Sequence, residues 1–181
     1  FGPPVWTIVY APRGGTTDAG ATFPPPAEEL IDLARVGTAS AQESARFWNR
    51  YGGLILGECR RLDIDPADAV GVLVTESSGR PFGADGRLLI RFENHQFWKY
   101  WGQANPALFN QHFAFDPGVT WQGHHWRADA QGPWLACHAS NAQEWQVLEF
   151  ARSLDEDAAL RSISMGAPQI MGRKMLDARL Q

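Results

Sequence analysis

The sequence has little sulfur and no long apolar run, and both absences narrow what the chain can be. Its two cysteines, Cys59 and Cys137, are too few for a disulfide framework or a cysteine-based zinc cluster. Their spacing does not say whether they pair, and two free buried thiols are the simpler interpretation. No stretch approaches the roughly 18 apolar residues that a membrane-spanning helix requires, so we expect no membrane insertion. A net charge of −4 argues against electrostatic binding of nucleic acid.

The sequence also lacks the short motifs of metal sites and of serine nucleophiles. A metal motif places ligands at fixed spacing, such as two histidines four apart on a helix with an acidic partner. The five histidines do not show it, so we predict no metal site, no cofactor, and structural or surface roles for them: His95, His112, His124, His125 and His138. Ser77 and Ser78 lack the Gly-x-Ser-x-Gly frame of a nucleophile elbow and suit a helix end or a hydrogen bond to a carboxylate.

What the chain does contain suits one globular domain. Its 181 residues, 44% of them hydrophobic, are enough to bury a core. Six of the eight tryptophans lie between residues 98 and 145, as core residues or as platforms for sugar rings, and we favour the core for any single one. Residues 1–26 are rich in proline and glycine and are predicted to be an extended segment, with one short strand at 5–10. Residues 27–181 would form the domain.

Hydrophobic periodicity and capping signals predict an α+β, mainly helical domain with one small β-hairpin sheet. We find no internal repeats. A capping box at 40–43 and a second at 141–144 each begin a helix, the first with a stripe of Phe47, Leu54, Ile55 and Cys59. We expect helices over residues 27–36, 40–61, 66–76, 94–102, 106–113, 141–154 and 155–162, the second of them interrupted or bent near Gly52-Gly53.

Glu76 is the most informative acidic residue. Asp65 is a good N-cap and Pro66 suits the first helical position, so a helix beginning there reaches Glu76 at its end, where Gly79 can close it in the left-handed conformation. Glu76 lies one turn beyond Val72, and we expect both on an apolar, buried face. Burial and the negative end of the helix would favour the protonated carboxyl, as a general acid requires. An ordinary, partly solvated helix end is the alternative.

A second carboxylate follows at a suitable distance along the chain. Asp85-Gly86 is a strong two-residue hairpin signal, because the turn needs a positive φ that glycine supplies. Residues 88–92 have the character of a strand, and Glu93 lies at its exit. A hairpin next to an acidic residue on a helix would form one wall of a groove, and long polymers bind in grooves.

A series of segments, in this order along the chain, resembles the N-acetylmuramidase domain of phage endolysins. The resemblance extends from about residue 45 to residue 172, and the segments are Thr-Glu-Ser-Ser-Gly at 75–79, then 85–87, 91–95, 113–117, 123–127, 144–151 and 162–172. It implies a lysozyme-like fold and cleavage of the β-1,4 bond between N-acetylmuramic acid and N-acetylglucosamine in peptidoglycan. Glu76 would be the catalytic acid and Glu93 the second carboxylate. Substrate-binding roles are predicted for Ser78, Arg91, His95 and Gln169.

The resemblance also predicts partners and location. The substrate would be peptidoglycan glycan strands, and the place of action the bacterial cell wall, in the periplasm or outside the cell, after release or delivery from the cytoplasm with no signal peptide visible. The family continues past the Met-Gly pair at 171–172 with further helices, so we expect a domain that is short at its C-terminal end. A completing chain or a delivery machinery attached through residues 1–26 would fit this expectation.

Two other functions fit the same residues. A lytic transglycosylase needs a similar single acid but yields an anhydro sugar. A wall-binding or structural module on a lysozyme-like fold would be inactive because its cleft is incomplete.

Overall fold

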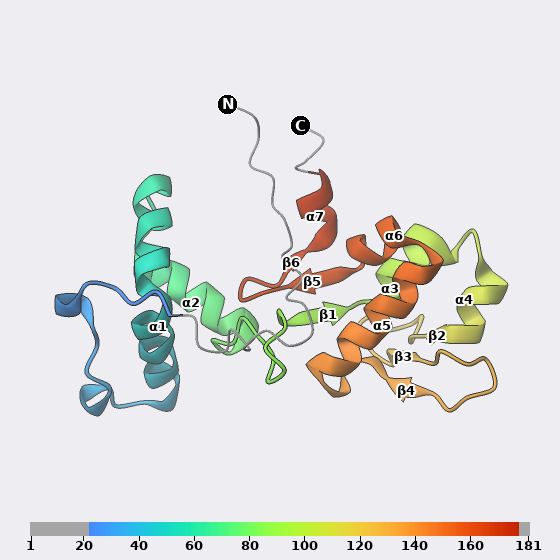
Figure 1. Ribbon diagram of the computed structural model, residues 1–181, viewed down its shortest axis with the longest axis horizontal. Helices are drawn as coiled ribbons and strands as arrows, with labels where there is room; N and C mark the ends of the chain where they lie inside the picture. Colours follow the sequence, from blue (N-terminus) through green and yellow to red (C-terminus); the bar gives the residue numbers. More distant parts are fainter. Residues whose placement is uncertain (1–21, 178–181) are drawn as a thin grey trace.

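The computed structural model describes residues 22–177 (Figure 1), and the strand expected at 5–10 lies outside this range. The helices are η2 (Ala27–Glu29), η3 (Leu33–Arg35), α1 (Ala39–Leu62), α2 (Pro66–Ser77), α3 (Asn94–Phe97), the π-helical η4 (Trp98–Gly102), α4 (Pro106–His112), η5 (Cys137–Ala139), α5 (Asn141–Leu154), α6 (Glu156–Arg161) and α7 (Gly172–Asp177). The strands are β1 (Ile90–Phe92), β2 (Phe113–Ala114), β3 (His125–Trp126), β4 (Leu135–Ala136), β5 (Ile163–Met165) and β6 (Ile170–Met171). The α+β, mainly helical class is confirmed. No helix within residues 22–177 is long and apolar enough to cross a membrane.

The described chain has two small antiparallel sheets where the sequence predicts one hairpin. One sheet has the order β1-β5-β6 and the other β2-β3-β4. The chain reverses near Asp85-Gly86, with φ of 73° at Gly86, but the turn is centred on Ala84 and Asp85, closed by Gly86 N donating to Gly83 O. Its arms share only an isolated bridge between Phe82 and Leu88. Strand β1 pairs instead with the distant β5, placing Phe92 opposite Ile163. The partner was missed because a hairpin signal is local, whereas this pairing joins residues far apart in the sequence.

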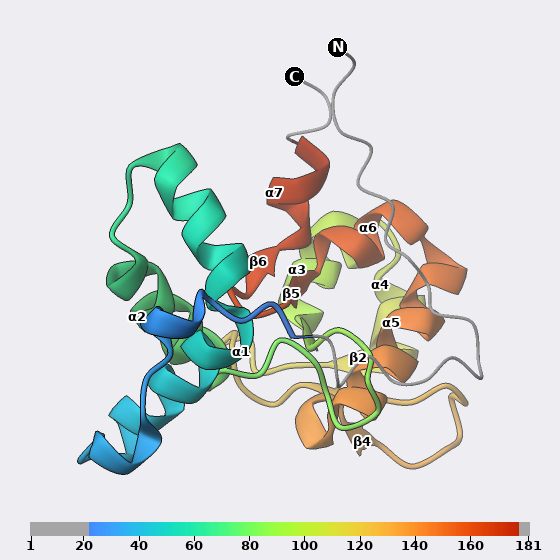
Figure 2. The same cartoon turned by 60° about the vertical axis from the view of Figure 1, so that its left-hand side comes forward.

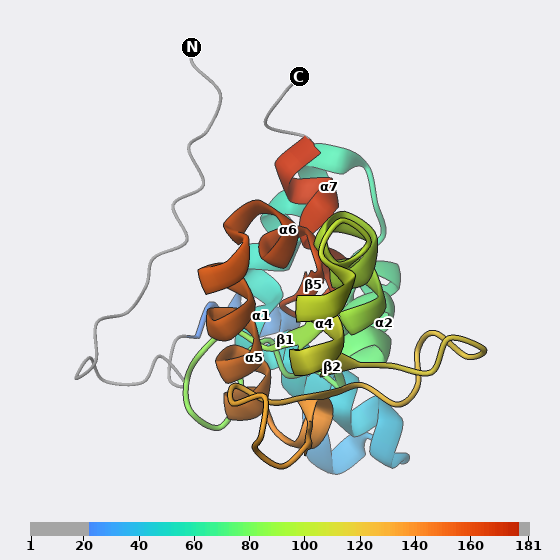
Figure 3. The same ribbon diagram turned by 90° about the vertical axis from the view of Figure 1, so that its right-hand side faces the viewer.

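Two buried clusters of apolar side chains divide the molecule. In Figure 1, α1 and α2 lie on the left, β1 and the β5–β6 hairpin in the middle, and α3 to α6 with the second sheet on the right; Figure 3 shows α4 and α5 in front of α1 and α2. The smaller cluster joins α1 to α2 through Phe47, Tyr51, Val70 and Val74. The larger one is built on aromatic rings, with Phe97 packed against Phe92, Trp101, Phe109 and Phe113. The β5–β6 hairpin reaches towards α1 (Figure 2), and Ala167 from its turn enters the smaller cluster.

The tryptophans divide between core and surface. Trp101, Trp126 and Trp145 are buried, in agreement with the preference for core positions. Trp121 and Trp134 are exposed. Aromatic density in this part of the chain therefore mainly reflects packing.

The single helix expected over residues 27–36 is absent; two 3₁₀ turns, η2 and η3, replace it. Side chains of α1 form hydrogen bonds with backbone groups that a continuous helix would use for its own hydrogen bonds. The Asn49 amide both accepts from Ile31 N and donates to Ile31 O, and Trp48 Nε1 donates to Glu29 O. These bonds hold the segment extended between its two turns.

Helix α1 begins at Ala39 with Thr38 as N-cap, two residues before the predicted capping box at 40–43, and runs without interruption through Gly52-Gly53. Leu54, predicted to belong to its apolar stripe, is exposed. The extended residues 22–26 lie along this helix, where Phe23 N donates to Arg50 O and Gly53 N donates to Phe23 O.

Candidate functional site

A cavity of about 340 Å³ lies where the end of α2 faces strand β1 and the start of α5. Four residues that the sequence predicts for the site line it: Glu76, Ser78, Arg91 and Gln169. The structure thus brings together one side chain from α2, one from the residue that caps it, one from β1 and one from the β5–β6 turn. Polar side chains converge on the cavity from separate elements, which suits a ligand rich in hydroxyl groups.

Glu76 occupies the last turn of α2, and the local structure matches the sequence reasoning closely. The Asp65 side chain accepts from Ala67 N at the start of the helix, and Pro66 is the first helical residue. Ser78, rather than Gly79 alone, closes the helix in the left-handed conformation, with φ of 52° at Ser78 and 65° at Gly79. Glu76 is exposed and lines the cavity, so it lies at the cavity rim.

The expected burial of Glu76 is wrong. Glu76 does share a helical face with Val72, as the four-residue spacing requires, but this face is exposed and Val72 is 58% accessible. The buried side of α2 is the neighbouring one, formed by Val70, Val74 and Ser77. The apolar run at residues 69–74 places hydrophobic side chains on every face of this short helix. It therefore does not indicate which face packs against the core. Glu76 is therefore a solvent-facing carboxyl group at a cavity rim.

Gln169 and Ser78 play different parts. Gln169 has a φ of 46°, and its side chain is engaged within its own hairpin, accepting from Ser164 Oγ and donating to Gly166 O. It therefore braces the turn that forms one edge of the cavity. Ser78 is exposed and lines the cavity.

Sequence reasoning missed the wall formed by the start of α5. Asn141 and Glu144 also line the cavity, as do His138 and Ser140. Ser140 is the N-cap of α5, so Glu144 does not close the predicted capping box. Instead Asn141 Oδ1 accepts from Ile90 N at 3.1 Å and Glu144 Oε2 accepts from Phe92 N at 2.8 Å.

These two bonds explain why α5 lies beside β1. Strand β1 is at the edge of its sheet, and the amides of alternate residues 90 and 92 point away from β5. Asn141 and Glu144 are three apart on one helical face and satisfy both amides. Glu144 Oε1 also pairs with His138 Nδ1 at 2.7 Å. The acid is buried, and both of its oxygens are occupied, so it is a structural carboxylate.

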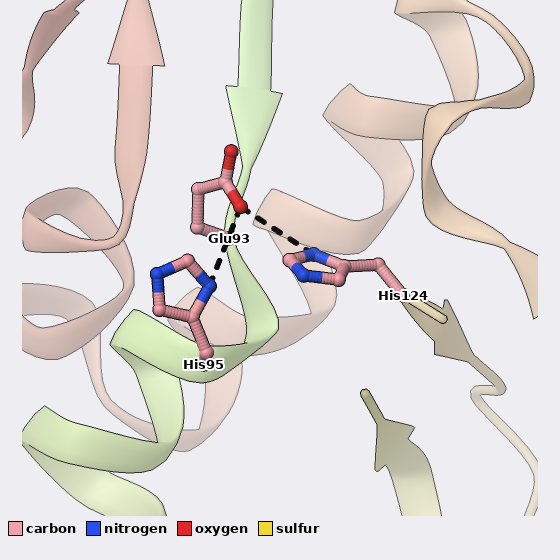
Figure 4. Close-up of side chains that lie close together, drawn as sticks. All are labelled: Glu93, His95 and His124. Atoms are coloured by element: carbon pink, nitrogen blue, oxygen red, sulfur yellow. Dashed lines mark ion pairs between the residues drawn. The ribbon is translucent and has the colours of Figure 1, made fainter. Parts of the chain in front are cut away.

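Glu93 and His95 lie outside the residues that line this cavity, although Arg91 connects them to it. Arg91 Nε donates to Glu93 Oε1 at 2.9 Å, and the Glu93 side chain is 14% exposed. Its other oxygen faces His95 Nδ1 at 3.4 Å and His124 Nδ1 at 3.5 Å (Figure 4). Burial lowers the pKa of both imidazoles below the ordinary value, against the opposing effect of the Glu93 charge, so both rings are neutral at neutral pH.

A larger cavity, of about 650 Å³, lies between α1, the start of α2 and the segment containing η2 and η3. Its walls are mostly apolar, with Trp48 and Val70 among them, and its one α2 acid, Asp65, is occupied as a helix cap. It lacks the converging polar side chains of the smaller cavity. We therefore place the candidate site at Glu76.

An acidic side chain at the end of a helix, facing an open polar cavity beside a small antiparallel sheet, defines a lysozyme-like α+β domain. The chain belongs to the N-acetylmuramidase family, whose model matches residues 65–179, well over half of its length. This range contains every residue of the cavity. Family membership supports peptidoglycan hydrolysis at the cell wall as the general activity. No curated protein matches the chain.

Proposed function

We propose that this protein hydrolyses the β-1,4 bond between N-acetylmuramic acid and N-acetylglucosamine, with Glu76 as the general acid. The observation that carries the proposal is the position of Glu76 at the rim of the polar cavity, within the part of the chain that matches the muramidase family. Glu76 would donate its proton to the glycosidic oxygen as the bond to C1 breaks. Water would add at C1, and its proton would pass to a second base or to solvent.

The exposure of Glu76 changes how its reactivity is explained. In the free protein the carboxyl group meets water, so the apolar surroundings of a lysozyme-type acid are not supplied by α2 itself. A glycan in the cavity would cover the carboxyl group with sugar rings and expel that water. We infer that substrate binding completes the environment of the acid.

Glu93 is the better candidate for the second carboxylate, although Glu144 is the other acid that lines the cavity. Both oxygens of Glu144 already accept bonds, from Phe92 N and from His138. Glu93 extends from the same face of β1 as the cavity-lining Arg91, and only one of its oxygens is held by that guanidinium. It would act as base for the attacking water or as a stabiliser of the oxocarbenium-like transition state.

The decisive variant is Glu76→Gln, which keeps the size of the side chain and removes the acid. Because a positioned general acid contributes about 10²–10⁴-fold, release of reducing sugar from purified sacculi should fall by that factor. Thermal unfolding should be unchanged, because the side chain is exposed. Glu58→Gln, on the exposed side of α1, is the matched control and should retain full activity. Near-complete activity in Glu76→Gln would remove Glu76 from the role.

Product analysis tests the bond and the reaction type. Borohydride reduction followed by mass spectrometry should reveal a reduced N-acetylmuramic acid at the new chain end. Reduced N-acetylglucosamine would indicate the other glycosidic bond. An anhydro product would indicate a lytic transglycosylase, and binding to sacculi without any release would indicate an inactive wall-binding module.

A further inference from the structure

Three potential metal ligands from separate elements meet at the exit of β1. Glu93 follows β1, His95 lies in α3, and His124 directly precedes β3 (Figure 4). Their nearest atoms, Glu93 Oε2 and the Nδ1 atoms of the two histidines, all lie within 4.8 Å of one another. His124 has no exposed side-chain surface, and the Glu93 and His95 side chains are mostly buried. Glu93 and His95 are close in the sequence, and the fold brings the distant His124 to them.

The ligand atoms face one another without the hydrogen bonds that buried polar atoms normally make. Glu93 Oε2 and His95 Nδ1 are both inaccessible to solvent, and neither has a hydrogen-bond partner among residues 22–177. Leaving a buried polar atom without a hydrogen bond is unfavourable, so such atoms in one place call for an explanation. A cation between them would satisfy both, with the ring proton of His95 on Nε2, 2.9 Å from the Gln96 side-chain amide, whose oxygen would then accept it.

The hydrogen bonds of His124 fix where its free lone pair points. Its Nε2 lies 2.8 Å from Thr120 O, an acceptor only, so Nε2 carries the ring proton. Nδ1 then bears the lone pair, and within the described part of the chain its one donor is Asn94 N, at a long 3.4 Å. The same nitrogen lies 3.5 Å from Glu93 Oε2, and two acceptors at that distance repel each other. A ligating histidine that donates its other ring nitrogen to a backbone carbonyl is the usual outer arrangement of a metal site.

The separations also suit a small divalent ion. Zinc takes nitrogen and oxygen ligands at about 2.0–2.2 Å, so two ligands of a tetrahedral zinc lie about 3.3–3.6 Å apart. The two distances from Glu93 Oε2, 3.4 and 3.5 Å, fall in that interval. The separation between the two histidine nitrogens, up to 4.8 Å, would close slightly on binding. Water would take the fourth position.

We propose that Glu93, His95 and His124 form a binding site for a divalent transition-metal ion, zinc being the ion best matched by two imidazoles and one carboxylate. Arg91 should weaken cation binding, because its guanidinium pairs with Glu93 Oε1 and places a positive charge near the site. It also fixes the carboxylate so that Oε2 faces the histidines. We therefore expect the metal to bind reversibly, as a regulatory ion does, and not as tightly as a permanent structural ion.

Metal binding has a consequence for activity that rests on the proposed function. The ion would ligate the oxygen of Glu93 that is not held by Arg91, the one left for the second carboxylate. Zinc should therefore inhibit the hydrolase. Occupancy itself is measured without any catalytic assay, so failure of the metal site and failure of the hydrolase assignment can be told apart.

The test is a titration of the untagged chain with Co²⁺ and then Zn²⁺, followed by visible absorption. The d–d bands of four-coordinate cobalt should grow to one equivalent and disappear when zinc displaces it. Glu93→Gln and His95→Ala should each weaken cobalt binding at least tenfold, since each removes one of three protein ligands. His125→Ala is the matched control, because His125 is an exposed neighbour of His124 whose Nδ1 lies at Gly123 O, and binding should be unchanged.

Two results would overturn the proposal. One is the absence of four-coordinate bands in the wild-type chain; the other is cobalt affinity that is the same in Glu93→Gln, His95→Ala and the wild type. His124→Ala removes a buried ring, so its circular dichroism is compared with the wild type first. The two less buried variants keep the test valid if that variant fails to fold.

Discussion

At the scale of single residues, buried polar side chains near the cavity do structural work that their sequence context conceals. Glu144 lies three positions after Asn141, which the sequence predicted as the N-cap, and a glutamate at that spacing normally closes a capping box; the cap in the structure is Ser140. In the fold it reaches across to Phe92 N and His138 instead. A glutamate side chain can accept either from the N-terminus of its own helix or from a neighbouring strand. Here the packing of β1 beside α5 decides for the strand.

Replacing Glu144 by alanine should therefore lower stability. The variant leaves the buried Phe92 N and His138 Nδ1 without their partner, and an orphaned buried donor costs about 1–3 kcal/mol. Urea unfolding measures the loss. Glu58→Ala, which removes only an exposed pair with Arg61, should stay within about 0.5 kcal/mol of the wild type. Equal midpoints for Glu144→Ala and the wild type would contradict the role assigned to this acid.

The two cysteines should be chemically silent in the folded protein. Both are free and buried, as the simpler interpretation of the sequence predicts, and they belong to different apolar clusters. Burial raises the pKa of the Cys137 thiol far above its usual range, so almost no thiolate is present near neutral pH. A thiol-reactive chromophore should detect no cysteine in the native state and both after unfolding in denaturant. Rapid reaction of one native thiol would show that its region opens readily.

At the scale of elements, two glycines in α1 allow the effect of helix propensity on stability to be distinguished from the effect of packing. An added Cβ at Gly53 would meet Pro24 O at 2.4 Å, because residues 22–26 lie against the helix there. At Gly57, one turn further along the same helix, an added Cβ meets nothing within 4 Å. The two positions are thus a matched pair with the same propensity and opposite surroundings.

We expect Gly57→Ala to stabilise the protein by up to about 1 kcal/mol, since alanine is that much better than glycine in a helix interior. Gly53→Ala should instead destabilise it, because the methyl group displaces the backbone at Pro24. Thermal unfolding of both variants gives the comparison. Stabilisation of similar size in both would mean that residues 22–26 do not hold their place on α1.

At the scale of the whole molecule, the cavity lies between two parts with separate cores. The α1–α2 pair supplies Glu76, whereas β1 and α5 supply Arg91 and Asn141. Among the described core residues, Ala167 is the one from outside α1 and α2 that packs into the smaller cluster. The width of the cavity therefore depends on how firmly a small apolar contact joins the two parts.

This division predicts uneven protection in native-state hydrogen exchange. The amides of α1 and α2, built on the smaller core, should open at lower free energy than those of α5, whose Val147, Leu148 and Ala151 are fully buried. Exchange followed by mass spectrometry of peptides resolves the two parts. Equal protection throughout would indicate one cooperative unit.

Particular residues show how far sequence reasoning reached. The cap at Asp65, Pro66 at the first helical position and the helix end at Glu76 follow from local backbone chemistry, and all are present. The α5 wall of the cavity was missed, because Asn141 and Glu144 look like ordinary residues of a helix start and their partners are about fifty positions away. His95 was predicted to bind substrate but lies with Glu93 and His124 outside the cavity lining, and its role in binding a glycan stays a prediction.

The sequence by itself determined the class of the fold, the order of most helices and the acid at the end of α2, because capping, proline placement and apolar periodicity act over a few residues. Tertiary structure alone decided which face of α2 meets water, which strand pairs with β1, and that an acid and two histidines meet at one point. Each of these depends on contacts between distant segments, whose free energy appears only once the chain has closed on itself.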